Sequence, residues 1–207
     1  MKKTIISIFL IGAMVLSATA CSFGSKFNEK KMVEFFEKKL DAEEEDYDDV
    51  YDSLDEGDFE EFTDGLYFKA DKKQMKEFTK GMEFSDYLGK TSKVTESINY
   101  FLVSQKNMSV AYIALWTFES KDDATDFLDN TAEAWEDTRE DYEDWAIADE
   151  EETEILAWFD EGKYGGVTYV GAYQDSNKVL VYLSMEDEDT IEDLCDYFKL
   201  DCATEIE

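Results

Sequence analysis

The chain has 207 residues with 52 acidic against 20 basic side chains, a formal net charge of −32, and neither histidine nor proline. The lack of histidine excludes Ser-His-Asp and Cys-His catalysis and histidine-based zinc sites within this chain. The single arginine, Arg139, and the acidic balance argue against nucleic-acid binding, which depends on neutralising phosphates.

The first twenty residues have the three zones of an export signal. Lys2 and Lys3 supply the positive start, and residues 5–16 form an apolar run of twelve. That run is shorter than the roughly 20 residues that a transmembrane helix requires. Small residues, 17–20, then lead directly to Cys21. We therefore expect residues 1–20 to be a signal peptide.

The stretch Ala18-Thr19-Ala20-Cys21 resembles the lipobox of bacterial lipoprotein precursors, although Ala18 stands where that motif prefers leucine. The resemblance implies that the thiol of Cys21 receives a diacylglyceryl group and that cleavage before it leaves a protein anchored on the extracytoplasmic face of a membrane. Two or three acyl chains suffice for stable anchoring. The alternative is an ordinary Ala-x-Ala cleavage site that frees a soluble protein. The likeness is confined to the first 21 residues.

Residues 21–28 are interpreted as the lipidated cysteine and a short linker, and residues 29–64 as an acidic helical segment. In the first part of that segment, apolar side chains recur at helical spacing. Residues 41–64 carry 14 acids, yet apolar positions still recur at intervals of three and four. The spacing therefore predicts helices with a solvated acidic face, forming a stalk or a lid.

Residues 65–207 are predicted to form an α+β domain, because runs of apolar residues alternate with helical patterns. Residues 179–183 are apolar at every position, which predicts a central strand covered on both faces. Strands are predicted at 66–68, 97–104, 109–118, 154–159, 166–173 and 178–184, with a hairpin connection at 105–108, a helix at 187–198, and helix N-caps at Asp71, Ser120 and Asp187.

The longest predicted helix spans residues 121–146. Its apolar side chains are spaced 4, 3, 4, 3, 4 and 3 residues apart, in one continuous stripe that must pack against a sheet. We expect the aromatic members to be core residues rather than a platform for sugar rings. The stripe consists of Ala124, Leu128, Thr131, Trp135, Thr138, Tyr142 and Trp145.

The expected fold is α+β, with an antiparallel sheet of five to six strands. The long helix and the C-terminal helix are expected to cover one face, and the N-terminal helices, roughly 28–56, to form a stalk or a lid. The nearest general architecture is ferredoxin-like, but the order of helices and strands does not fit it cleanly.

No set of residues predicts an active site, a cofactor site or a metal centre. The least arbitrary carboxylate pair for hydrolysis is Asp160 and Glu161, after an apolar strand, but a solvated hairpin loop is the favoured interpretation of this pair. A calcium loop starting at Asp52 fails, because its third and twelfth positions are not ligands. Weak binding of divalent ions along residues 122–144 stays open.

Cys195 and Cys202 are seven positions apart, and a continuous helix would separate them by about 10.5 Å. A disulfide needs Cα atoms within about 7 Å, so it requires the helix to end near Lys199 and the tail to fold back. The alternative is two reduced thiols.

These observations favour a membrane-anchored, extracytoplasmic and non-enzymatic binding or interaction protein. A carboxylate-based hydrolase acting on cell-envelope or dietary glycans and an accessory subunit of a membrane complex are the alternatives. Expected partners are the membrane through the lipid, a cationic protein, or weakly bound divalent cations. The lysine-rich segments 26–39 and 65–93 are expected to face the membrane, with the acidic residues 119–161 turned outward.

Overall fold

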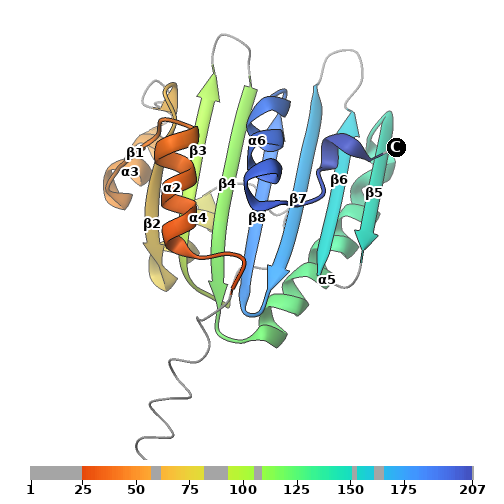
Figure 1. The fold of residues 1–207 in the computed structure, drawn as a ribbon, viewed down its shortest axis with the longest axis horizontal. Helices are drawn as coiled ribbons and strands as arrows, with labels where there is room; N and C mark the ends of the chain where they lie inside the picture. The colour runs from red at the N-terminus through yellow and green to blue at the C-terminus, as the bar shows by residue number, and fades with distance from the viewer. Residues whose placement is uncertain are drawn as a thin grey trace, which may run out of the picture.

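A single eight-stranded sheet organises the domain, in the order β1-β2-β3-β4-β8-β7-β6-β5 (Figure 1). The computed structural model describes residues 25–56, 62–81, 93–104, 109–150, 153–160 and 166–206. The predicted signal peptide and Cys21 lie outside the described residues. The strands are β1 (Glu43–Glu44), β2 (Leu66–Asp71), β3 (Val94–Ser104), β4 (Ser109–Phe118), β5 (Asp144–Glu150), β6 (Glu154–Asp160), β7 (Val167–Asp175) and β8 (Lys178–Met185). The helices are α2 (Glu29–Lys39), α3 (Tyr47–Glu56), α4 (Lys72–Gly81), α5 (Lys121–Thr138) and α6 (Glu188–Phe198), with short 3-10 helices at Arg139–Asp141 and Ala203–Glu205.

Neighbouring strands are antiparallel throughout the sheet except at one edge, where β1 pairs in parallel with β2. The predicted pairing of β3 with β4 is confirmed, although the connection 105–108 lies outside the described residues. The acidic segment 29–64 contributes α2, β1 and α3 to this same domain. None of the helices that the structure describes is long and apolar enough to cross a membrane.

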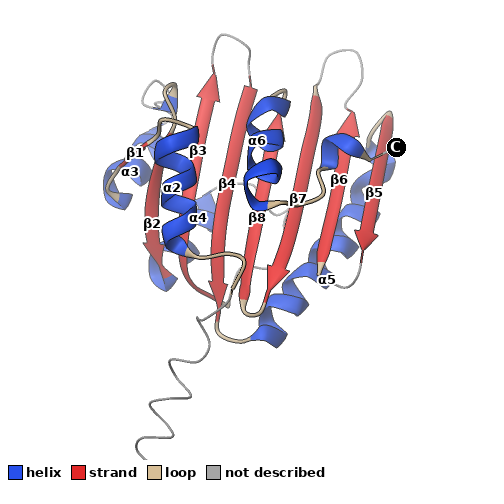
Figure 2. Ribbon diagram, viewed as in Figure 1, coloured by secondary structure: helices blue, strands red, loops and turns tan. Residues whose placement is uncertain are grey.

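The prediction of an α+β fold is confirmed, but the expected sheet of five to six strands was too small. The two strands that the sequence did not predict are β1 and β5, one at each edge of the sheet. The expectation that helices cover one face was also wrong, because α2 and α6 lie on one face while α4 and α5 lie on the other (Figure 2).

Helices on both faces follow from the side chains of β8. Its six central residues are all buried. Successive side chains of a strand point to opposite faces. Val179 and Val181 accordingly join the hydrophobic core under α5, whereas Leu180 and Tyr182 join the core under α2 and α6. A strand buried on both sides needs two helical layers, so the apolar run at 179–183 predicted this correctly.

The long helix is shorter than predicted, since α5 ends at Thr138. Trp135 is fully buried, as expected of a core residue, and its ring lies 6.3 Å from that of Phe159. Tyr142 also contacts Phe159, with ring centroids 4.8 Å apart, but from beyond the helix. Trp145 belongs to β5 and is 38% exposed. The stripe therefore continues across a change of secondary structure because both segments pack on the same core residue.

The three predicted N-caps are confirmed. The carboxylate of Asp71 accepts hydrogen bonds from the backbone N–H groups at positions 73 and 74, at 2.8 and 3.0 Å. Ser120 accepts from Asp123 N–H at 3.1 Å, and Asp187 from Thr190 N–H at 3.2 Å. Each cap satisfies backbone donors that the first turn of its helix leaves unpaired.

A buried polar cluster crosses the centre of the sheet on the α4 and α5 side. Asn99 on β3 is fully buried, and its Oδ1 accepts hydrogen bonds from Tyr112 Oη at 2.7 Å and Trp116 Nε1 at 3.4 Å. Its Nδ2 donates to Ser97 Oγ at 2.8 Å. One amide therefore satisfies three buried polar groups, which ties β3 to β4.

On the other face, a glycine makes room for a buried aromatic ring. Gly171 on β7 stands opposite Tyr182 on β8, and a Cβ atom at position 171 would lie 2.5 Å from the tyrosine ring. The Tyr182 hydroxyl in turn accepts a hydrogen bond from the backbone N–H of Ala203 at 3.0 Å. The ring therefore links the sheet to the C-terminal segment.

Candidate functional site

The hollow that is lined by charges of both signs lies at one end of the sheet. We call it the proximal end: it comprises the last residues of β2, β4 and β7, the first residues of β3 and β8, and the segment 25–28 that leads into α2. The described chain begins at this end, with the segment 25–28 (Figure 1). The backbone N–H of Lys26 donates to the carboxylate of Asp175, at the end of β7.

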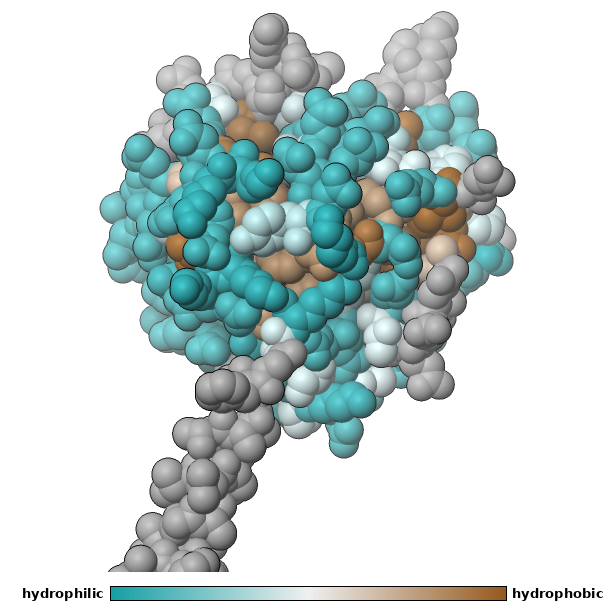
Figure 3. Space-filling view, in the orientation of Figure 1, coloured by the Kyte–Doolittle hydropathy of each residue, from teal (hydrophilic) through white to brown (hydrophobic). Residues whose placement is uncertain are grey.

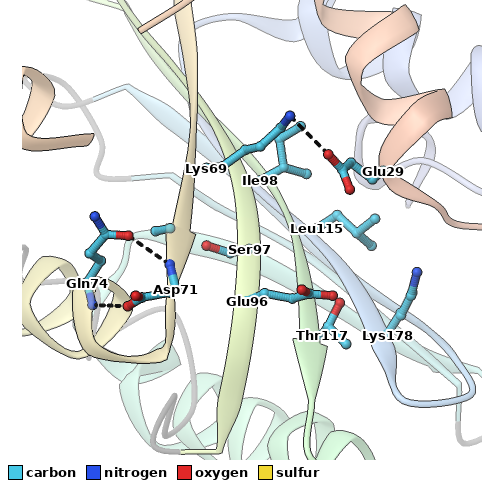
Figure 4. A pocket seen from close by; sticks show the side chains of 11 residues that line it. Glu29, Lys69, Asp71, Gln74, Glu96, Ser97, Ile98, Leu115, Thr117 and Lys178 are labelled. Atoms are coloured by element: carbon cyan, nitrogen blue, oxygen red, sulfur yellow. Dashed lines mark hydrogen bonds and ion pairs between the residues drawn. The ribbon is translucent and has the colours of Figure 1, made fainter. Parts of the chain in front are cut away.

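A groove of about 310 Å³ lies at the proximal end and is lined by residues of β2, β3, β4 and β8 together with the starts of α2 and α4 (Figure 4). We call it the sheet groove. Ile98 and Leu115 give it an apolar floor, and they are paired neighbours on β3 and β4. Its volume falls at the lower end of the range for small-molecule sites, which is about 300–1,000 Å³. The charged and polar residues around the floor are Glu29, Lys69, Asp71, Gln74, Glu96, Ser97, Thr117 and Lys178.

Several of these charges are already engaged. The ammonium of Lys69 lies 3.0 Å from Glu29 and 3.3 Å from Glu44, and its hydrogen bond to Glu29 raises its pKa. Asp71 caps α4. Among the described residues, the structure pairs neither Glu96 nor Lys178 in a salt bridge. An anion and a cation therefore stand over an apolar floor with their charges available to a ligand.

The groove residues were missed at the sequence level. Glu96 and Lys178 come from strands that are more than eighty positions apart in the chain, and each is an ordinary charged residue near a strand end. Only the antiparallel order β3-β4-β8 brings them to the same end of the sheet. Without the sheet order, no local signal could have singled them out.

A larger hollow of about 520 Å³ lies at the opposite end of the sheet, beside the four consecutive acids that precede and begin α6. Three of them have structural roles. Glu186 accepts a hydrogen bond from the backbone N–H of Val167, Asp187 caps α6, and Glu188 accepts from the Tyr169 hydroxyl at 2.6 Å. In the part of the chain that the structure describes, no three acidic or thiol groups are arranged to hold a metal ion.

Only one member of the carboxylate pair considered for hydrolysis lies within the described residues. Asp160 is partly buried at the end of β6, where its backbone C=O accepts a hydrogen bond from Glu143 N–H at 3.1 Å. Glu161 lies outside the described residues.

The chain turns back between Cys195 and Cys202, as a disulfide between them would require. The helix α6 ends at Phe198, and Lys199 has left-handed backbone angles (φ 58°, ψ 60°) that turn the chain back. Cys195 and Cys202 are 3% and 5% exposed, and both are free thiols. The hydrogen bond between the thiols, together with burial, raises the pKa of Cys195, whereas accepting that bond lowers the pKa of Cys202. The thiols are therefore in direct contact in an apolar site.

No protein-family model and no curated protein sequence matches this chain. Among solved structures, the chain is similar to the extracellular domain of PknH from Mycobacterium tuberculosis, with 12% sequence identity and a TM-score of 0.39. The match covers 56% of this chain and 66% of that one. At this level the likeness assigns neither a family nor a function.

Proposed function

We propose that this protein is a lipid-anchored, extracytoplasmic binding protein. Acyl chains on Cys21 would hold it at the membrane, and the sheet groove would receive its ligand. The groove carries the proposal: it sets the free charges of Glu96 and Lys178 over an apolar floor. That combination suits a small zwitterion with an apolar part, such as a free amino acid or a short peptide.

The groove is tested with the soluble domain (residues 22–207) and a panel of free amino acids and dipeptides. We expect at least one apolar member to raise the melting temperature. The Lys178→Met and Glu96→Gln variants should each reduce that ligand's affinity at least about tenfold, because each removes one charge-assisted contact of roughly 1.5–3 kcal/mol. Lys38→Met, which changes an exposed lysine on α2, is the matched control. If both groove variants bound the ligand with unchanged affinity, the ligand would bind outside the sheet groove.

The anchor is tested by Cys21→Ser in the full-length chain. We expect the wild-type protein in the membrane fraction and the variant in the soluble extracytoplasmic fraction, because the hydroxyl of serine cannot replace the thiol that accepts the lipid. Fractionation followed by immunoblotting gives the distribution, and Cys202→Ser is the control that keeps the anchor. A Cys21→Ser protein that stays membrane-bound would exclude the lipid.

A cationic protein or divalent ions would find a separate surface on α5. Its solvent-facing side carries acids in every turn and lies on the opposite face of the sheet from α2 and α6. We include such a partner in the proposal because so dense a set of carboxylates favours positively charged partners. The exposed acids are Asp122, Asp126, Asp129, Glu133, Glu136 and Asp137.

A further inference from the structure

We propose that a lysine pocket at the proximal end binds the phosphate group of an anionic phospholipid and so holds the anchored domain in one orientation on the membrane. The pocket is a hollow of about 350 Å³ lined by Lys26, Lys31 and Lys199 with the aromatic residues Tyr197 and Phe198. This proposal rests on the proposed function only in that an anchor places the pocket near the bilayer.

The arrangement of the lysines leaves their charge available. The Lys26 ammonium donates to the backbone C=O of Lys199 at 3.2 Å, and the Lys31 ammonium donates to the C=O of Lys26 at 3.3 Å. Among the described residues, the structure pairs none of the three with a carboxylate in a salt bridge, and no acid lines the pocket. Each ammonium has three N–H donors, so carbonyl contacts leave donors for a phosphate.

The backbone fixes two walls of the pocket. Lys199 stands at the left-handed turn that ends α6, and Lys31 lies in the first turn of α2, capped by Asn28. The ring of Tyr197 packs against Phe35 of α2, with centroids 5.3 Å apart. The two helices are therefore held together by aromatic contacts, with the lysines around their adjoining ends. Figure 3 shows this face, where hydrophobic surface appears between the two helices inside a hydrophilic border.

The pocket lies close to the predicted lipid anchor, which favours a membrane as its partner. Four residue steps separate Cys21 from Ser25, and a fully extended chain spans at most about 3.6 Å per residue, so the lipid-bearing residue lies within roughly 15 Å of the domain. Lys26 follows immediately. Tyrosine is also enriched where proteins meet the headgroup region, because its ring is apolar and its tip is polar. Tyr197 supplies such a ring beside the three lysines.

The wider distribution of charge supports the same orientation. Further lysines lie at the proximal end, at the starts of α4, β3, α5 and β8. The run of four acids, Glu186 to Asp189, lies at the far end. Charges beyond a Debye length of about 8 Å are largely screened in physiological salt, so the lysines that line the pocket act on a headgroup in contact with them although the whole chain is acidic. Of the further lysines, Lys72 and Lys93 pair with Glu119 and Lys73 pairs with Glu77, whereas Lys121 and Lys178 form no salt bridge among the described residues. These further lysines are Lys72, Lys73, Lys93, Lys121 and Lys178.

The test uses a tether that does not depend on lipidation. A hexahistidine tag replaces residues 1–20 of the Cys21→Ser protein, which is then bound to vesicles that carry a nickel-chelating lipid in either phosphatidylcholine or phosphatidylglycerol. Acetylation of lysines by an N-hydroxysuccinimide ester is followed by mass spectrometry. We expect Lys26, Lys31 and Lys199 to react at least about fivefold more slowly on phosphatidylglycerol than on phosphatidylcholine. Lys38 and Lys39, at the other end of α2, should react equally on both.

A variant pair completes the experiment. The rate of dissociation from phosphatidylglycerol vesicles is measured after the tag is released with imidazole. This rate should be at least about tenfold lower for the unmodified domain than for the Lys26→Gln/Lys31→Gln/Lys199→Gln variant. Lys38→Gln/Lys39→Gln/Lys76→Gln makes the same change of charge on exposed residues elsewhere and should behave like the unmodified domain. Equal protection on both lipids, or equal loss in both triple variants, would overturn the pocket. If inorganic phosphate without vesicles protects the three lysines from acetylation, the ligand of the pocket is a soluble anion rather than a lipid. None of these outcomes depends on whether Cys21 carries a lipid.

Discussion

Replacing Asn99 with leucine should lower the free energy of unfolding by about 3 kcal/mol. The two side chains have the same branching and the same number of heavy atoms, so the change removes polarity without opening a cavity. It removes the oxygen atom that accepts hydrogen bonds from the hydroxyl of Tyr112 and the indole N–H of Trp116, and both residues are fully buried. Each buried polar group that loses its partner costs roughly 1–3 kcal/mol. Urea denaturation of the soluble domain measures the loss.

The control replaces a buried polar group that makes no such contribution. Thr168 on β7 is fully buried, and within the described residues its Oγ1 has no hydrogen-bond partner. Thr168→Val should therefore leave stability unchanged or raise it by about 1 kcal/mol, since it removes a desolvated hydroxyl of nearly the same shape. The polar-cluster interpretation would fail if Asn99→Leu were as harmless as Thr168→Val.

The exported protein should carry a disulfide between Cys195 and Cys202, and reducing it should cost about 2.5 kcal/mol of stability. The chain-entropy relation gives that value for the eight residues from 195 to 202. As the chain folds after export, the thiolate of Cys202 attacks an external disulfide such as glutathione disulfide and releases one thiol. Cys195 then loses its proton, attacks the Cys202 sulfur of the mixed disulfide and releases the second thiol.

Mass spectrometry after alkylation without reductant determines whether both thiols are consumed in protein taken from the extracytoplasmic compartment. Unfolding with and without dithiothreitol then gives the change in stability. The Cys202→Ala variant is the control and should unfold at the same denaturant concentration in both conditions. Two alkylated thiols in the exported protein would show that the pair stays reduced.

Local patterns predicted most of the strands and all three helix caps, because these depend on neighbouring residues. The strands β3, β4, β6, β7 and β8 fall close to their predicted bounds, and Asp71, Ser120 and Asp187 cap helices as expected. The pattern at 121–146 failed for a physical reason. Trp135 contacts Phe159 from the helix, and Tyr142 contacts it from the segment after the helix. The helical spacing of core residues in the sequence therefore continues beyond the end of the helix.

Features that depend on strand order were beyond local patterns. Nothing near Glu96 or Lys178 indicates that both line one groove, because sheet order brings them together. The lysine pocket combines the start of α2 with the end of α6, which are more than 160 residues apart. The sequence alone shows that 26–39 is rich in lysine, but it indicates nothing about Lys199 except a position near which a helix ends if the two cysteines are to form a disulfide.

Gly171 helps to fix the register in which β7 pairs with β8. The absent side chain creates a slot in β7 that accepts the ring of Tyr182, and sliding the strand by two residues would fill that slot with Tyr169 or Tyr173. The Tyr182 hydroxyl accepts a hydrogen bond from the backbone N–H of Ala203, next to Cys202. The position of the Tyr182 ring therefore also determines the position of the C-terminal segment. A methyl group at position 171 would therefore disturb the meeting of the two thiols without touching either of them.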